Sequence, residues 1–169
     1  MRYIITLFGI VGIALLISQT GYLYPHLFFS VYENDVRLYV GSEIITTQEE
    51  ILEYEGTKVS LDSRTNFTIK DIETDQLAFY ASRGHWIVTP DRKIKTCTRA
   101  VCATTSSVIE MRYYTPGEVV DIEPTGDTFV TFKDQTFELK AGDRMRIDEL
   151  TGQTFIQSPS DGIDTSSTP

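Results

Sequence analysis

The stretch Thr57-Lys58-Val59-Ser60-Leu61-Asp62-Ser63-Arg64-Thr65-Asn66-Phe67-Thr68-Ile69 decides the fold class of this chain. Apolar and polar residues alternate from Thr57 to Leu61, and after a polar turn the alternation resumes at Phe67 and Ile69. A period of two places the apolar side chains on one face of a strand, and polar turn residues between two such runs indicate a chain reversal. The stretch therefore predicts two short strands, each with one buried face.

The same alternation recurs in the rest of the chain. It predicts strands over residues 77–81, 87–88, 108–109, 119–122, 128–132, 137–139 and 145–147, with turns at Pro116-Gly117, Thr125-Gly126-Asp127 and Ala141-Gly142-Asp143. Residues 47–54 are compatible with a helical turn or two and equally with a strand edge. We expect an all-β fold of short stacked antiparallel or solenoid-like strands, forming a compact sandwich or a β-solenoid.

Residues 1–30 predict a membrane anchor with an interfacial segment. The run Tyr3–Ile17, extended through weaker residues to Leu23, reaches the roughly 20 residues that a membrane-spanning helix needs. With Arg2 as its flanking positive charge, the N-terminus is expected in the cytoplasm and the domain outside, in a single-pass arrangement. The alternative is a signal peptide whose cleavage secretes the domain, although Ser18-Gln19-Thr20 is a poor cleavage site because of its β-branched threonine.

The remaining sequence divides into a domain over residues 31–150 and a Ser/Thr-rich tail over residues 151–169. The tail has few hydrophobic residues and is expected to be disordered. The formal net charge of −9 argues against a nucleic-acid partner, because neutralising phosphates requires a large basic surface.

Several segments of residues 38–150 resemble the FecR-like domain of bacterial envelope proteins. They are Val40-Gly41-Ser42-Glu43-Ile44-Ile45-Thr46-Thr47, the stretch Gly56–Ile69, Leu77–Gly84 as a strand that ends in a glycine turn, and Phe137–Asp143 as a closing turn. The resemblance implies a compact β architecture in the cell envelope. Known members couple an outer-membrane signal to a cytoplasmic anti-sigma segment, and relatives with only the outer domain are envelope scaffold or interaction proteins.

Cys97 and Cys102 enclose four residues in a run without helical pattern. The spacing suits a disulfide that closes a hairpin, and such a bridge persists outside the cytoplasm. A metal site is the alternative, with His85 as the nearby histidine, and free thiols are a third possibility. A Thr-Cys pair after an anchor is also typical of sortase transpeptidases, but His85 precedes Cys97 by only 12 residues, and in that family the separation is several tens.

A basic segment is the candidate interaction patch. Between positions 83 and 99, the positively charged residues are accompanied by a single acidic residue, Asp91, whereas residues 33–75 are strongly acidic. This charge asymmetry is suited to guiding a partner. A basic but merely solvated hairpin is the other interpretation, and Trp86 is either an exposed anchor or a core residue. The patch consists of Arg83, His85, Trp86, Arg92, Lys93, Lys95 and Arg99.

The sequence contains no phosphate loop, zinc-protease helix motif or serine nucleophile elbow. We therefore expect no enzymatic activity, no cofactor and no catalytic residue. The expected function is that of an anchored interaction or sensor module that binds an envelope protein or a glycan. The alternatives are a cysteine-dependent enzyme built on Cys97, His85 and Arg99, and a scaffold that self-assembles through exposed strand edges. The oligomeric state is not specified by the sequence.

Overall fold

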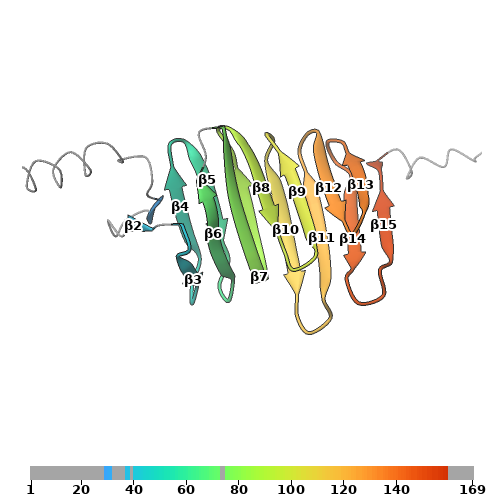
Figure 1. The fold of residues 1–169 in the computed structure, drawn as a ribbon, viewed down its shortest axis with the longest axis horizontal. Helices are drawn as coiled ribbons and strands as arrows, with labels where there is room; N and C mark the ends of the chain where they lie inside the picture. Colours follow the sequence, from blue (N-terminus) through green and yellow to red (C-terminus); the bar gives the residue numbers. More distant parts are fainter. Residues whose placement is uncertain (1–28, 32–36, 39, 73–74, 160–169) are drawn as a thin grey trace, which may run out of the picture.

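The computed structural model describes residues 29–31, 37–38, 40–72 and 75–159, and this part of the chain is all-β, as predicted (Figure 1). Its 15 strands are β1 Phe29–Val31, β2 Arg37–Leu38, β3 Glu43–Ile45, β4 Glu50–Tyr54, β5 Thr57–Leu61, β6 Asn66–Ile72, β7 Gln76–Thr89, β8 Lys93–Cys97, β9 Val101–Thr105, β10 Ile109–Tyr114, β11 Val119–Pro124, β12 Thr128–Phe132, β13 Gln135–Leu139, β14 Arg144–Asp148 and β15 Thr154–Gln157.

The strands form one curled sheet whose centre is the long strand β7. Nine of them lie in the order β13-β12-β9-β8-β7-β10-β11-β14-β15. The first half of β7 pairs with β6 and, in parallel, with β8, while its second half pairs antiparallel with β5 and β10. We call the part with β3, β6, β8, β9, β12 and β13 the first arm, and the part with β4, β5, β10, β11, β14 and β15 the second arm.

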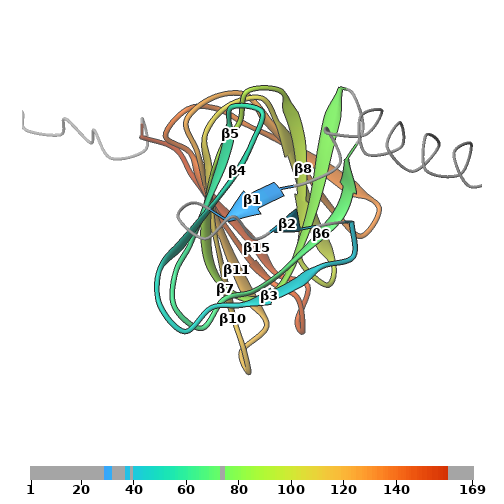
Figure 2. The ribbon, with the colours of Figure 1, turned by 90° about the vertical axis from the view of Figure 1, so that its left-hand side faces the viewer.

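Figure 2 looks along the row of strands and shows the two arms as layers that face each other. Gly84 lies where β7 passes from one arm to the other, at a φ of 109° that side chains rarely adopt. A Cβ atom there would lie 2.5 Å from the Cα atom of Thr65. Thr65 in turn binds the backbone of His85 through its hydroxyl group. Only glycine therefore allows this close crossing of two chain segments.

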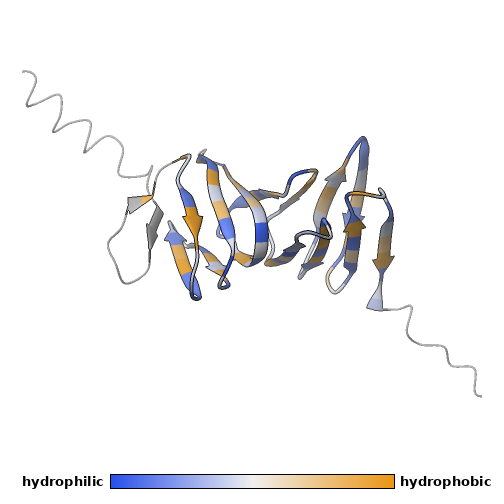
Figure 3. Cartoon of the chain, turned by 90° about the horizontal axis from the view of Figure 1, so that it is seen from below, coloured by the Kyte–Doolittle hydropathy of each residue, from blue (hydrophilic) through white to orange (hydrophobic). Residues whose placement is uncertain are grey.

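The core lies between the arms. Hydrophobic and hydrophilic residues alternate along the strands (Figure 3), and the apolar set faces inward. Trp86 of the second arm is 0% exposed, and its indole N–H donates a 2.9 Å hydrogen bond to the hydroxyl oxygen of Thr96 in the first arm. Its ring also lies edge-on to Phe67, with centroids 6.3 Å apart. Buried contacts thus join the two layers.

The structure corrects several boundaries. Residues 50–54 form strand β4, which settles the choice between helix and strand there. The chain does not turn at Gly84 as the family resemblance implied, because β7 continues to Thr89. Strand β15 lies within the expected disordered tail, where it pairs with β14. The three turns predicted at positions 116–117, 125–127 and 141–143 do separate strands that are consecutive in the sequence.

Of the predicted N-terminal anchor and interfacial segment over residues 1–30, residues 1–28 lie outside the described part of the chain, as do residues 160–169 of the tail, while residues 29–30 belong to β1. Within the described ranges, no helix has the length and apolar character needed to cross a membrane.

Candidate functional site

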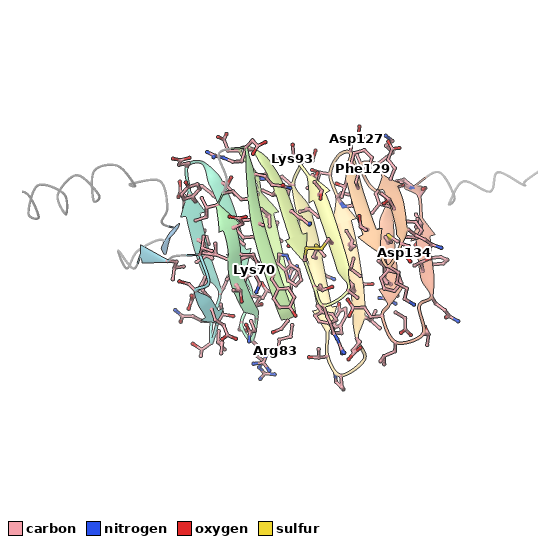
Figure 4. All side chains as sticks on the ribbon, in the orientation of Figure 1. Lys70, Arg83, Lys93, Asp127, Phe129 and Asp134 are labelled. Atoms are coloured by element: carbon pink, nitrogen blue, oxygen red, sulfur yellow. A yellow bond between two sulfur atoms is a disulfide. The ribbon has the colours of Figure 1, made fainter. Side chains whose placement is uncertain are left out.

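The structure disperses the basic patch predicted from the sequence. Trp86 belongs to the core, so its alternative role as an exposed anchor is wrong. Figure 4 places Arg83 and Lys93 at opposite ends of the strands, at the bottom and the top of the view. The alternating burial of β8 leaves Lys93 and Lys95 exposed on its outer face, and these two residues remain neighbours.

Arg92 and Arg99 of the basic segment each have an acidic partner close in space. Arg92 approaches Glu55 in the turn between β4 and β5 at 2.5 Å, and lies over the ring of Tyr54. Arg99 forms a 3.0 Å ion pair with Glu118. These ion pairs neutralise two arginines of the predicted basic patch. The sequence pattern does not reveal the pairs, because the acidic partners lie at least 19 positions away along the chain.

His85 lies on the outer face of the second arm, between two carboxylates. Its Nδ1 atom is 2.6 Å from Asp62 and its Nε2 atom is 3.0 Å from Glu110. His85 therefore belongs to a row of polar and charged side chains on the second arm, separate from the lysines of β8.

The two cysteines form the predicted disulfide. Cys97 and Cys102 are directly opposite each other on β8 and β9, with Cα atoms 4.1 Å apart. Since they are the only cysteines in the chain, neither thiol is free in this structure. The bridge removes the nucleophile required by the cysteine-enzyme hypothesis, and also the thiolate ligands required by the metal hypothesis.

A candidate surface site lies on the outer face of the second arm. The register places Arg112, Asp121, Arg146 and Phe155 side by side on four successive strands, from β10 to β15. A shallow cavity of about 360 Å³ opens along this row. We call it the aromatic groove, and its lining consists of Arg112, Tyr114, Asp121, Glu123, Arg144, Met145, Arg146, Phe155 and Gln157.

Carboxylates neutralise the three arginines of the groove. Arg146 makes a bidentate contact with Asp121, with nitrogen to oxygen distances of 2.6 and 2.7 Å. Arg144 pairs with Glu123 at 3.3 Å, and Arg112 pairs with Glu110 on its own strand. The result is a row of planar donors and acceptors whose charges largely cancel.

These pairs also fix the protonation states. The hydrogen bond and charge of Asp121 raise the pKa of Arg146 above its ordinary value. Partial desolvation lowers the pKa of Arg112, but the charge of Glu110 and hydrogen bonds with Tyr114 and Glu110 outweigh it, so the net shift is upward. Both guanidinium groups thus remain charged donors at any physiological pH.

Two aromatic side chains stand at the ends of the row. Tyr114 is 47% exposed on β10, and Phe155 is 64% exposed on β15. Both rings line the cavity and are open to solvent. The groove can therefore offer apolar ring faces and, between them, hydrogen-bonding groups.

None of the groove residues was predicted from the sequence. The sequence pattern that relates to them is the set of polar residues in each alternating strand, for example within positions 119–124 and 144–148. That half indicates which residues face solvent. It gives neither the order β10-β11-β14-β15 nor the pairing of Asp121 with Arg146, because both depend on contacts between residues far apart in the chain.

The fold is similar to that of known structures. Two crystal structures of a candidate anti-sigma factor from Parabacteroides distasonis ATCC 8503, at 2.50 and 1.65 Å resolution, each match with a TM-score of 0.61 and 15% sequence identity. Each match covers 69% of this chain and 59% of the other chain, so the chain spans less than two thirds of that protein. No protein-family model and no curated protein matches the sequence. At this identity, the similarity concerns the fold.

Proposed function

We propose that this protein is a FecR-like module of the bacterial cell envelope, held outside the cytoplasm by its N-terminal residues, and that it binds a glycan without catalysing a reaction. The similarity to a candidate anti-sigma factor supports a sensor family, since the two chains share a fold. The disulfide between Cys97 and Cys102 supports a location in an oxidising compartment. Glycan occupancy of the groove is the event that such a sensor would report to a protein partner.

The aromatic groove carries this proposal. A pyranose ring has an apolar face of C–H groups and an edge of hydroxyl groups, so it fits a site with exposed aromatic rings and planar hydrogen-bonding side chains. Tyr114 and Phe155 supply the rings, while Asp121 and Arg146 supply donors and acceptors.

The charge balance favours a neutral sugar over an anionic ligand. Arg144 and Arg146 each already have a carboxylate partner, and an added phosphate or carboxylate would have to displace Glu123 or Asp121. A hydroxyl group can bind the outer lone pairs and N–H groups of such a pair and leave the pair intact. The volume of about 360 Å³ is also at the small end of the range for ligand sites.

The test uses the full chain in detergent micelles and a panel of neutral hexasaccharides, with chitohexaose and maltohexaose as the first probes. Isothermal titration should detect binding of at least one of them. Tyr114→Ala and Phe155→Ala should each weaken that binding by about 10-fold or more, as expected for the loss of one aromatic contact.

Phe129→Ala is the matched control. Phe129 is 51% exposed on β12 of the first arm, away from the groove, so its removal should leave the affinity unchanged (Figure 4). Equal losses in all three variants, or no binding by any sugar of the panel, would refute a glycan site in this groove.

A further inference from the structure

A second cavity adjoins the aromatic groove on the outer face of the second arm. It has a volume of about 630 Å³, and Glu123 and Arg144 line both cavities. Glu123 lies directly opposite Glu110, which lies directly opposite Ile87 on β7, so this cavity follows the row of residues next to that of the groove. The two cavities meet at Glu123 and Arg144, and one ligand can therefore occupy both.

The wall of the second cavity is more apolar than polar. Ile87 and Val108 are half-buried, Pro124 is buried, and all three side chains line the cavity. The groove differs, because two exposed aromatic rings supply most of its apolar surface. A sugar ring stacks on a flat aromatic ring, whereas aliphatic side chains around a hollow suit a small apolar substituent such as a methyl group. The second cavity is thus suited to a substituent of a sugar that lies in the groove.

The other two carboxylates of the second cavity are already engaged. Glu110 contacts two basic side chains of the second arm. Asp143 accepts hydrogen bonds of 2.8 and 2.7 Å from a backbone N–H group of its own turn and from a hydroxyl group that follows β15. A ligand in this cavity therefore finds its charged partners at the junction with the groove.

The ion pair at the junction leaves hydrogen-bonding atoms available. Nε of Arg144 lies 3.3 Å from Oε2 of Glu123, and this is a single contact. Arg146, in contrast, uses two nitrogens for both oxygens of Asp121. Among the described residues, neither the terminal nitrogens of Arg144 nor Oε1 of Glu123 has a partner. The junction therefore offers a charged acceptor beside charged donors.

We infer that the ligand of this site is a glycan of N-acetylated amino sugars, whose acetamido group binds at the junction; the inference rests on the proposed function. The amide N–H donates to Oε1 of Glu123, the amide oxygen accepts from a terminal N–H of Arg144, and the methyl group enters the second cavity beside Val108. The acetamido group is uncharged, so the ion pair stays intact. A hydroxyl group in its place is too short to reach both partners and leaves the apolar wall in contact with water.

A matched pair of sugars tests the inference. Chitotetraose and cellotetraose have the same linkage and differ at C2, where the first carries an acetamido group and the second a hydroxyl group. In isothermal titration with the full chain in detergent micelles, chitotetraose should bind about 10-fold more tightly or better, because a site built for a polar group discriminates against an analogue that lacks it. Equal affinities would overturn the acetamido site and leave glycan binding in the groove standing. Binding of neither these sugars nor the hexasaccharides would contradict the proposed function, and this inference with it.

Arg144→Met locates the discrimination. The substitution keeps an unbranched aliphatic side chain and removes the guanidinium donors, so the affinity for chitotetraose should fall to within about 3-fold of that for cellotetraose. Arg83→Met is the matched control, since Arg83 is exposed on β7 and lines neither cavity, and the preference for chitotetraose should stay unchanged in this variant. A preference that survives Arg144→Met, or that disappears equally in both variants, would contradict binding of the acetamido group at the junction.

Discussion

The outer faces of the two arms differ in how their charged side chains are paired. On the first arm, Lys93 and Lys95 make no ion pair with any described residue, and a covalent bridge between Cys97 and Cys102 holds β8 to β9. On the second arm, charged side chains pair across strands, as Arg146 does with Asp121. The difference shows that the net charge of −9 does not describe either surface. On the second arm the charges largely cancel, so shape and aromatic rings would decide the proposed binding.

A substitution where β7 passes from one arm to the other should have the largest effect on the free energy of unfolding. Gly84→Ala forces a Cβ atom to within 2.5 Å of the Thr65 backbone at a positive φ. A loss of about 3–5 kcal/mol in the free energy of unfolding is expected from the clash and the backbone strain. Urea denaturation measures it. Gly117→Ala is the control, since Gly117 has no positive φ and an added Cβ atom there meets nothing closer than 3.8 Å.

The hydrogen bond that joins the arms gives the next largest effect. Thr96→Val keeps the shape of the side chain but leaves the indole N–H of Trp86 without its acceptor in a fully buried position. A destabilisation of about 2 kcal/mol is expected. In a double-mutant cycle with Trp86→Phe, the two substitutions should cost less together than the sum of their separate effects. Strict additivity would show that the bond does not couple the arms.

The covalent bridge and the ion pairs should differ in strength. Replacing Cys97 and Cys102 with serine should cost about 2 kcal/mol, because the bridge closes a short loop. Asp121→Asn should cost about 0.5 kcal/mol, since Arg146 in this pair is 64% exposed. Thermal unfolding of both variants in parallel checks the order. An ion pair that matches the bridge in strength would reverse the comparison.

The smallest effect concerns pH. Burial, and the hydrogen bond that Tyr113 donates to Glu149 at 3.0 Å, raise the pKa of Tyr113 above its ordinary value of 10.0. A raised tyrosine pKa adds stability that is complete below pH 10 and is lost as the pH rises toward the pKa of the folded protein. The free energy of unfolding should therefore fall as the pH rises above 10, and that of Tyr113→Phe should fall less steeply. Parallel curves would exclude Tyr113 as the cause.

How far the sequence predicts this molecule depends on the range of the interactions. Strands such as Thr57–Leu61 follow from local alternation, and the pairing of Cys97 with Cys102 follows from a separation of five residues. Neither β8 nor β9, the two strands of the disulfide hairpin, was among the predicted strands, and Val101-Cys102-Ala103-Thr104-Thr105 alternates only weakly in polarity. Strand β15 was missed because its order depends on β14 and not on its own composition.

The dispersal of the predicted basic patch has a related reason. A charge-rich segment of sequence suggested a patch, but alternate residues of a strand point to opposite faces, so His85 faces solvent while Trp86 enters the core. The acidic partners of Arg92 and Arg99 come from other strands and turns. The groove itself gathers residues from four strands, which no linear pattern contains.

The most direct test of the central claim, that the second arm is the ligand-binding face, is a titration of the isotope-labelled protein with chitohexaose, followed by amide chemical shifts. We expect shifts confined to β10, β11, β14 and β15, strongest near Tyr114 and Phe155, and none on β8, β9 or β12. Shifts concentrated around Lys93 and Lys95 on the first arm, or no shift at millimolar sugar, would contradict it.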